Sequence, residues 1–425
     1  MLDVFGIGFG PANLAFAIAA QEEGTLRVEF AERQERFGWH RGMLLGGATL
    51  QVSFLKDLAT MRNPTSDFSF VTYLHRRGRL ADFINHKTLY PTRVEFHDYL
   101  SWAAERLDHL VTYGVEVTEI RPEVVGDVIE HFTVVLRDGT GREETRQARN
   151  VVVATGLRPR LPDGMRASAR VWHTSAFLER VRTIPADAAR VVVVGAGQSA
   201  AEVTEYLHTH FPRTEVVGVT SRYGYSPADD SPFVNRIFDP AAVDDFYDAP
   251  EHTKRMLMEY HRGTNYSVVD LDLINELYRR AYSEKVDGVQ RLRLLGASRV
   301  VAVHDGPSGA HVVVEHLTTG GRSELDADAV VFATGYRAFE PEDLLGAAAE
   351  LCVRDSHGRV KVSRDYRLEL SLDAAGGIYL QGGTEHTHGL SSSLLSTAAV
   401  RAGEILTAVG PPVPAQSIPV VHSGR

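Results

Sequence analysis

A glycine-rich stretch near the start of the chain has the residue types of a turn that binds the phosphates of a dinucleotide. Gly6, Gly8 and Gly10 follow a short apolar run, and Pro11 opens a stretch of strong helix formers. Glycines at such a turn let a pyrophosphate approach the positive N-terminal end of the helix. Glu32 ends the next apolar run, roughly 20 residues on, where a ribose-binding carboxylate is expected. The spacing predicts a site that suits the adenosine of FAD.

A second stretch of the same kind lies near the middle of the chain. Gly195 and Gly197 follow an uninterrupted valine run, and Gln198 and Ser199 open the next helix-forming segment. The next apolar run is followed by a cation, Arg222, where the first unit has an acid. A cation at this place accommodates a 2′-phosphate, so the site is expected to prefer NADPH to NADH. Two turns with opposite charges predict two different dinucleotides, as in flavoenzymes that pass hydride from nicotinamide to flavin.

The elements that position these turns follow from the hydrophobic pattern. Each turn joins an apolar run to a helix-forming stretch and a second apolar run, which is the pattern of a β-α-β unit. Further along, residues 271–282 favour a helix and residues 289–318 alternate as β-hairpins do. We therefore predict an α/β protein with two Rossmann-like dinucleotide-binding domains and a mainly helical substrate-binding insertion.

The domain order is predicted from where these patterns begin and end. The first nucleotide domain is expected to resume after the second, because the apolar strands before Thr155 and Thr334 both end in Ala-Thr-Gly. The expected parts are the FAD-binding domain over 1–165 and 336–410, the NADPH-binding domain over 166–225 and 285–335, the insertion over 226–284, and a flexible tail over 411–425.

Composition excludes several classes of function. The 425 residues include 45 Lys+Arg and 55 Asp+Glu, and the net charge of −10 argues against nucleic-acid and anionic-membrane partners. The single cysteine, Cys352, excludes an internal disulfide, an iron–sulfur cluster and CxxC redox chemistry. It favours a reducing, cytoplasmic location. The His208/His210 and His386/His388 pairs lack a metal-binding pattern, so no metal site is predicted.

Six specific motifs stand in the chain: Leu50–Thr60, Gly195–Glu202, Asp230–Asn235, Gly263–Asp270, Asp328–Tyr336 and His388–Ser396. With these motifs the chain resembles the flavin-dependent N-hydroxylating monooxygenases, and within them the L-ornithine N5-monooxygenases. The resemblance implies FAD and NADPH as cofactors, dioxygen and an amino-acid substrate as partners, and a homotetramer. It also implies N-hydroxylation of L-ornithine through a C4a-hydroperoxyflavin, in the synthesis of a siderophore or a related natural product.

The resemblance also implies roles for individual residues on the flavin and substrate sides. Lys56 and Asn235 match residues that hold the substrate carboxylate, and a bound carboxylate would give Lys56 a partner in its apolar surroundings. Gln51 matches a residue beside the flavin ring, with Trp39 and His40 in a nearby loop.

Further matched residues lie nearer the reacting groups and the nicotinamide. Leu394 matches a residue that touches the flavin, and Ser396 one near the reacting amine. Asn265 matches a contact to both the amino acid and the nicotinamide ribose, and its neighbour Thr264 is assigned to NADPH with Gln198, Ser199 and Arg222. Gln51, Asn265 and Ser396 would support the reaction, and no residue is required as a nucleophile.

Other functions remain open from sequence alone. The nearer alternative is N-hydroxylation of L-lysine or a diamine, because one methylene is worth only about 1–3 kcal/mol of discrimination. The more remote alternative is another flavin-dependent NAD(P)H oxidoreductase, such as a disulfide reductase, which would need a second thiol that this chain lacks. A catalytically silent nucleotide-binding protein is the third.

Overall fold

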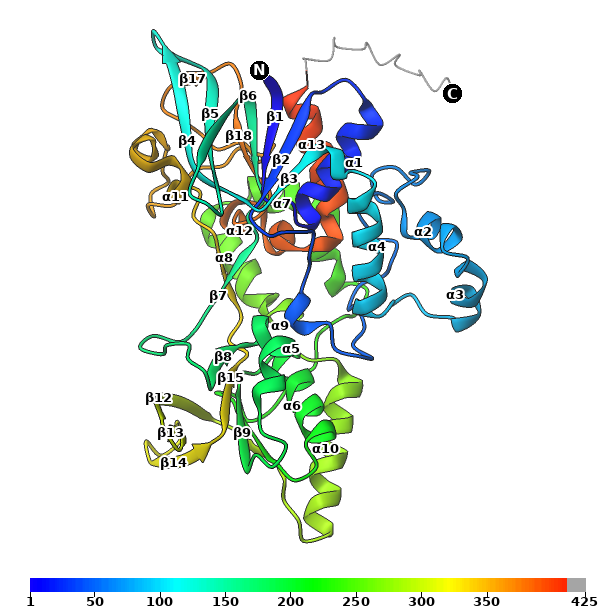
Figure 1. Cartoon of the computed structure of the whole chain (residues 1–425), viewed down its shortest axis with the longest axis vertical. Helices are drawn as coiled ribbons and strands as arrows, with labels where there is room; N and C mark the ends of the chain where they lie inside the picture. The colour runs from blue at the N-terminus through cyan, green and yellow to red at the C-terminus, as the bar shows by residue number, and fades with distance from the viewer. Residues whose placement is uncertain (411–425) are drawn as a thin grey trace, which may run out of the picture.

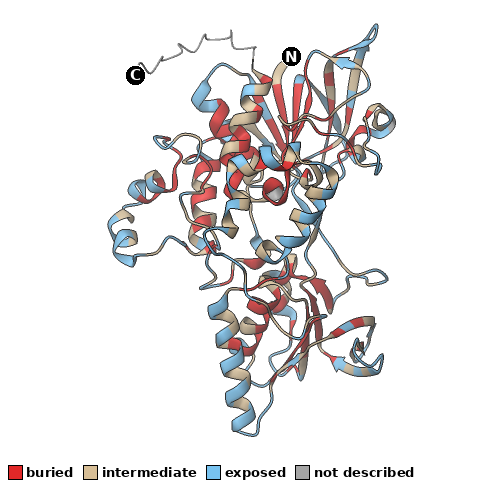
Figure 2. Cartoon of the chain, turned by 180° about the vertical axis from the view of Figure 1, so that it is seen from behind, coloured by how far each residue is buried: buried red, intermediate tan, exposed pale blue. Residues whose placement is uncertain are grey.

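The computed structural model describes residues 1–410, without the side chains of Ala347 and Ser393, and it has two lobes (Figure 1). The tail predicted over 411–425 lies outside the described residues. The upper lobe in Figure 1 contains the first turn, and the lower lobe contains the second. Buried strands run through the middle of both lobes (Figure 2). The predicted fold class, two Rossmann-like units in an α/β protein, is confirmed.

The upper lobe is built on an eight-stranded sheet with the order β17-β5-β6-β1-β2-β3, where β18 pairs with β6 and β4 with β5. β1 runs parallel to both β2 and β6, so its carboxyl end opens between them. Its strands are β1 (Leu2–Ile7), β2 (Val28–Glu32), β3 (Val111–Tyr113), β4 (Val115–Val125), β5 (Val128–Asp138), β6 (Glu143–Val153), β17 (Asp373–Ala374) and β18 (Ile378–Leu380).

Helix α1 occupies the centre of the upper lobe. Its residues from Asn13 to Ala20 are all buried, as expected for a helix that is apolar on every side and is covered by other helices. It packs against α13 and α4. The helices of this lobe are α1 (Pro11–Glu23), α2 (Phe70–Arg76), α3 (Leu80–His86), α4 (Arg93–Glu105), α11 (Glu342–Leu345), α12 (Glu385–His388) and α13 (Ala398–Val409).

The lower lobe has a five-stranded parallel sheet with the order β11-β10-β9-β15-β8 and a separate antiparallel sheet β12-β13-β14. The valines of β9 are buried, which fits a central strand covered on both faces. Its elements are β8 (Val171–His173), α5 (Phe177–Arg180), β9 (Arg190–Val194), α6 (Gln198–His210), β10 (Glu215–Val219), β11 (Leu292–Leu295), β12 (Ser298–Gly306), β13 (Gly309–His316), β14 (Arg322–Ala327) and β15 (Ala329–Phe332).

The lobes are joined by covalent links and by packed side chains. The antiparallel pair β7 (Leu157–Pro159) and β16 (Tyr336–Ala338) carries the chain out of the upper lobe and back into it. In addition, the segment that follows β2 extends to the lower lobe, where the side chains of Met43 and Leu45 are buried in the apolar core. The lobes therefore share buried apolar contacts as well as covalent links.

The segment 226–284 packs in two directions. Helix α7 (Pro240–Asp248) contacts α12 of the upper lobe, while Leu277 of α10 (Leu271–Val286) is buried in the core of the lower lobe. Helices α8 (Glu251–Tyr260) and α9 (Arg262–Asn265) lie between them in the chain. This segment therefore spans both lobes, and the domain boundaries proposed from sequence stay a prediction.

Candidate active site

The first turn has the open geometry that a phosphate requires. Gly8 has a φ of +80°, and a Cβ there would lie 2.6 Å from the carbonyl oxygen of Ala154. Gly10 caps α1 without a side-chain hydrogen bond, and a Cβ on it would meet no atom within 4 Å. The first amides of α1 therefore have no side-chain cap and face open space, which fits a bound pyrophosphate.

Asn13 stands where a strict GxGxxG motif has its third glycine, and it fixes the first turn. Its buried Nδ2 donates to the carbonyl oxygens of Gly8 (2.7 Å) and Ile7 (3.2 Å). Its Oδ1 accepts from Nε2 of Gln381 (3.1 Å). This departure from the motif gives the turn additional buried hydrogen bonds.

Glu32 ends β2 beside the first turn. Its buried carboxylate accepts hydrogen bonds from the N–H groups of Phe9 (2.8 Å) and Gln34 (2.9 Å). These two bonds fix the orientation of the carboxyl group. The carboxylate therefore lies at the edge of the turn, where a ribose-binding acid is expected.

The second turn repeats this geometry in the lower lobe. A Cβ on Gly195 would collide with the carbonyl oxygen of Ala333, so the turn passes too close to β15 for a side chain. Gly197 caps α6 without a side-chain hydrogen bond, and Gln198 and Ser199 form the first turn of the helix. This second uncapped helix end also fits an anionic ligand.

A continuous cleft of about 3370 Å³ between the lobes brings most of the predicted residues together. Both turns contribute to its lining, as do the loops that follow β2 and α12. The predicted residues on its wall are Gly8, Gly10, Pro11, Glu32, Trp39, His40, Gln51, Lys56, Gly195, Gly197, Gln198, Ser199, Asn235, Thr264, Asn265, Leu394 and Ser396.

Two predicted residues do not line the cleft. Gly6 lies within β1, where a Cβ would collide with the ring of Phe30. Arg222 lies beside the cleft, and its Nη1 donates to the carbonyl oxygen of Ser267 (2.9 Å). Ser267 itself lines the cleft next to the second turn, so Arg222 is adjacent to the wall without forming it.

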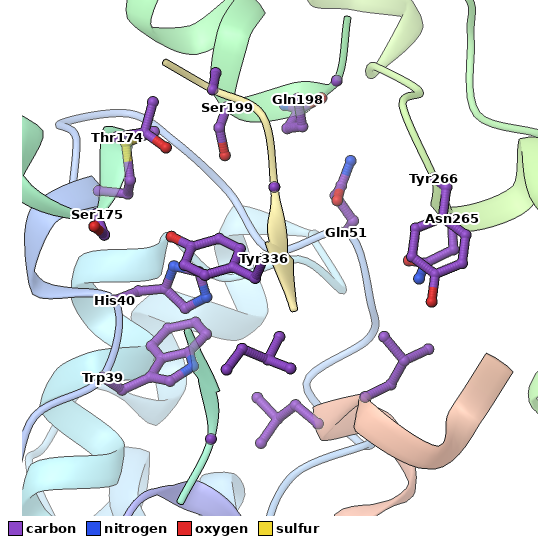
Figure 3. A pocket seen from close by; sticks show the side chains of 18 of the residues that line it. Trp39, His40, Gln51, Thr174, Ser175, Gln198, Ser199, Asn265, Tyr266 and Tyr336 are labelled. Carbon is purple, nitrogen blue, oxygen red and sulfur yellow. The ribbon is translucent and has the colours of Figure 1, made fainter. Parts of the chain in front are cut away.

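Figure 3 shows Trp39 and His40 on one side of the pocket and Asn265 on the opposite side, with Gln51 between them. His40 has a left-handed backbone, with φ of +48°. Its side chain meets solvent in the open cleft, but the surrounding protein atoms, and then the charge of Arg93, lower its pKa to about 4. His40 is therefore neutral at physiological pH.

Lys56 lines the cleft from a loop that is held by the neighbouring carboxylate. Asp57 is buried and accepts from the N–H groups of Ala59 (2.9 Å), Thr60 (2.6 Å) and Phe70 (2.6 Å). Burial raises the pKa of Asp57, against the effect of these hydrogen bonds. Lys56 itself is half-buried and forms no ion pair with a carboxylate of residues 1–410. A cation in this position can accept an anionic group of a ligand.

The other predicted substrate residues come from distant parts of the chain. Nδ2 of Asn235 donates to the carbonyl oxygen of Asp230 (2.8 Å), which orders the loop before α7. Ser396 is buried at the cleft wall in a 3₁₀ turn before α13. Beside Asn265, the hydroxyl of Tyr266 donates to Oε1 of Glu385 (2.5 Å) and links the insertion to α12.

A sequence model of the family "L-lysine 6-monooxygenase/L-ornithine 5-monooxygenase" matches residues 1–338. The chain belongs to this family. The resemblance inferred from the six motifs is thus confirmed. Within residues 1–410, this chain has no group of three or more His, Cys, Asp or Glu side chains that could hold a metal ion. No helix in that described part is long and apolar enough to cross a membrane.

Relatives and solved structures cover nearly the whole monooxygenase chain. The Kutzneria sp. 744 ornithine N-hydroxylase KtzI, solved with reduced FAD, NADP⁺ and L-ornithine, is 49% identical to this chain. Its TM-score is 0.93, and the match covers 96% of this chain and 99% of that one. The ornithine hydroxylase PvdA from Pseudomonas aeruginosa is 38% identical with a TM-score of 0.90, covering 96% and 98%. An L-ornithine N(5)-monooxygenase from Burkholderia cepacia is 43% identical over 92% of this chain and 90% of the relative.

Several polar residues on the cleft wall of this monooxygenase were not predicted from sequence. Arg93, Glu202, Asp270, Tyr336 and Arg401 all line the cleft. Glu202, Asp270 and Tyr336 end three of the quoted motifs, which is a signal that could have pointed to them. Arg93 and Arg401 lie in helices without a distinctive pattern, and only the packing brings them to the wall.

Proposed function

We propose that this monooxygenase hydroxylates the side-chain amine of L-ornithine. The reaction consumes NADPH, a proton and dioxygen, and it yields N5-hydroxy-L-ornithine, NADP⁺ and water. The observation that carries the proposal is one cleft lined by two uncapped dinucleotide turns and by Lys56, a cation without an ion-pair partner among residues 1–410. The names of two of the relatives described above support the same substrate.

We assign the first turn to FAD and the second to NADPH. Gly8, Gly10 and Glu32 have the geometry for the pyrophosphate and ribose of FAD, and Gly195 and Gly197 have it for NADPH. When bound, the flavin supplies the oxygen activation, which no side chain of the protein can perform. Trp39, His40, Gln51 and Leu394 are assigned to the flavin side, and Gln198, Ser199, Arg222 and Thr264 to the NADPH side.

The chain's own residues bind and orient the amino acid. Lys56 and Asn235 are assigned to the substrate carboxylate, and Asn265 and Ser396 to the rest of the amino acid. The reacting nitrogen must be neutral to attack oxygen, so the site has to favour the unprotonated amine. Ser396 is buried at the cleft wall, and a buried place of this kind suits a desolvated amine.

The two alternative enzyme functions differ in how they fit the cleft. A disulfide reductase needs two thiols, and the only cysteine, Cys352, is 7% exposed with a pKa raised by burial to about 11. A diamine has no carboxylate for Lys56, which favours an amino acid. L-lysine has both groups, and side-by-side assays of ornithine, lysine, putrescine and cadaverine decide among these substrates.

Replacing Lys56 tests the proposal. Lys56→Ala removes a charge-assisted contact worth about 1.5–3 kcal/mol, so the KM for ornithine is expected to rise about 10- to 100-fold. Flavin reduction by NADPH should stay near the parent rate, because Lys56 belongs to the substrate side. Lys285→Ala, an exposed residue of α10, is the matched control. An unchanged KM for ornithine in Lys56→Ala would contradict the carboxylate assignment.

We propose further that the protein works in the cytoplasm as a homotetramer and supplies a hydroxamate precursor for a siderophore or a related natural product. The lone buried cysteine supports a reducing location. The family resemblance supports the tetramer and the pathway. Light scattering on the purified protein tests the oligomeric state, and product analysis in cells deprived of iron tests the pathway.

A further inference from the structure

Five side chains form a hydrogen-bonded chain in the wall of the cleft, and backbone contacts of the upper lobe join its two ends; we call this set the interlobe ring. They are Gln51 and Arg93 of the upper lobe, Gln198 and Glu202 of α6, and Asp270 at the start of α10. The strongest contact crosses between the lobes. Nη1 and Nη2 of Arg93 donate to Oε2 (2.7 Å) and Oε1 (2.6 Å) of Glu202.

The remaining contacts continue from Glu202 back to the upper lobe. Nε2 of Gln198 donates to Oε1 of Glu202 (2.9 Å) and to Oδ2 of Asp270 (2.8 Å). The N–H of Asp270 donates to Oε1 of Gln198 (2.8 Å). Nε2 of Gln51 donates to Oδ1 of Asp270 (2.9 Å). Both oxygens of Asp270 and of Glu202 are thus engaged.

Backbone contacts close the ring on the upper-lobe side. The N–H of Arg93 donates to the carbonyl oxygen of Ala48 (2.8 Å), and the N–H of Leu50 donates to that of Pro91 (2.9 Å). Gln51 follows directly, so Gln51 and Arg93 lie on two segments of the upper lobe that are hydrogen-bonded to each other. On the other side, Gln198 and Glu202 stand four residues apart on one face of α6. The ring therefore ties one face of α6 to one piece of the upper lobe.

Burial makes the Arg93–Glu202 ion pair costly to break. Arg93 is 9% exposed and Glu202 is 7% exposed, so neither charge can be left without its partner at low cost. The two parallel N–H···O bonds also fix the angle between guanidinium and carboxylate, which a single contact would not. The Arg279–Glu276 pair also has two such bonds, but it is exposed, so solvent weakens it.

We propose that Arg93 and Glu202 are positioning residues that set the orientation of the second turn relative to the flavin side of the cleft. Through Gln198 they hold the first turn of α6, and through the 48–51 segment they hold Gln51. This inference rests on the proposed function, in which hydride passes across this part of the cleft. Hydride transfer requires reacting atoms about 3–3.5 Å apart, and a misplacement of about 1 Å costs on the order of 100-fold in rate.

Anaerobic stopped-flow reduction of the FAD-loaded enzyme by NADPH tests the proposal. In Glu202→Gln, the maximal reduction rate is expected to fall about 10- to 100-fold, while the half-saturating NADPH concentration changes less than about threefold. Arg93→Lys keeps the positive charge but cannot form two parallel hydrogen bonds to the carboxylate. Its maximal reduction rate should lie between those of Glu202→Gln and the parent enzyme. Glu215→Gln, which breaks ion pairs inside the lower lobe only, is the matched control and should reduce at the parent rate.

Hydrogen–deuterium exchange supplies a readout that does not depend on turnover. In the FAD-loaded Glu202→Gln variant without NADPH, amide exchange should be faster than in the parent in both residues 198–203 and residues 48–51. In Glu215→Gln, amide exchange in both segments should match the parent. Faster exchange in α6 alone would mean a local role and overturn the proposal. So would a parent-like reduction rate in Glu202→Gln, or a loss confined to NADPH affinity. If Glu202→Gln does not retain FAD, Arg93→Lys carries both measurements.

Failure of the proposed function would be visible separately. A parent enzyme that reduces its flavin with NADPH but does not hydroxylate ornithine contradicts the substrate and leaves the test of the interlobe ring intact. A parent that hydroxylates ornithine, with a Glu202→Gln variant reduced at the parent rate, contradicts the interlobe ring only.

Discussion

The two dinucleotide turns have nearly the same backbone plan but different sources of support. The first turn is held from within its own lobe, by the buried amide of Asn13 and by Gln381 behind it. The second turn is held by residues from outside its β-α-β unit: Gln198 bonds to Asp270 of the insertion and, through Glu202, to Arg93 of the upper lobe.

This difference has a physical consequence for the two sites. A turn fixed by buried contacts within one lobe keeps its shape when the lobes move relative to each other. A turn fixed across the cleft keeps its shape only while the two lobes keep the same relative orientation. We therefore expect the first site to hold its ligand persistently and the second to suit a ligand that enters and leaves. Three experiments would break or sharpen this comparison.

Alanine at the glycines should have the largest effect and should separate the two turns. Gly8→Ala places a Cβ 2.6 Å from a carbonyl oxygen at a φ of +80°, which is expected to cost about 2–4 kcal/mol and to release FAD. Gly195→Ala should abolish tight NADPH binding with FAD retained. Flavin absorbance and NADPH titration measure the two outcomes. Loss of FAD from Gly195→Ala would show that the turns are not independently supported.

Acid should weaken the upper lobe through a buried histidine near the first site. His388 is 1% exposed, stacks on Tyr366 with ring centroids 4.2 Å apart, and has a pKa lowered to about 4, chiefly by burial. Below pH 6.5 the unfolded chain binds this proton and the folded chain does not, so stability falls as pH falls towards 4. The loss between pH 6.5 and pH 5 is about 2 kcal/mol.

Urea unfolding followed by flavin fluorescence checks this pH dependence. His388→Gln should flatten it, because the variant has no group that titrates at this position. His357→Gln, at an exposed histidine, serves as the control and should keep the parent slope. Equal slopes in His388→Gln and the parent would assign the acid sensitivity to other groups.

Removing the cation beside the second turn should have the smallest effect. Arg222 is partly exposed, and within the described residues its guanidinium bonds only to a backbone carbonyl, so Arg222→Ala should fold normally. Loss of one charge-assisted contact, about 1.4 kcal/mol, would reduce the preference for NADPH over NADH about tenfold. The ratio of kcat/KM for the two nucleotides measures it. An unaltered ratio would remove Arg222 from the 2′-phosphate site.

Local pattern was sufficient to predict most elements around the site. The strand expected at the start of the chain is β1, and the helix expected over 271–282 is α10, which continues to Val286. The hydrophobic pattern could not predict that the insertion packs against both lobes, because an amphipathic helix does not specify which lobe covers its apolar face. The role of Asn13 was also missed, since its partners are backbone carbonyls that turn towards it only after β1 and α1 have packed.

By itself, the sequence determined where the chain turns, which charge follows each turn, and which family the chain resembles, because glycine freedom and strand and helix periodicity act over a few residues. Only the tertiary structure decided how the two turns face one cleft and what holds them there. Arg93 and Glu202 are 109 positions apart, and their pairing exists only when the lobes have packed and excluded water. Burial, which makes that pair strong and specific, is a property of the folded chain.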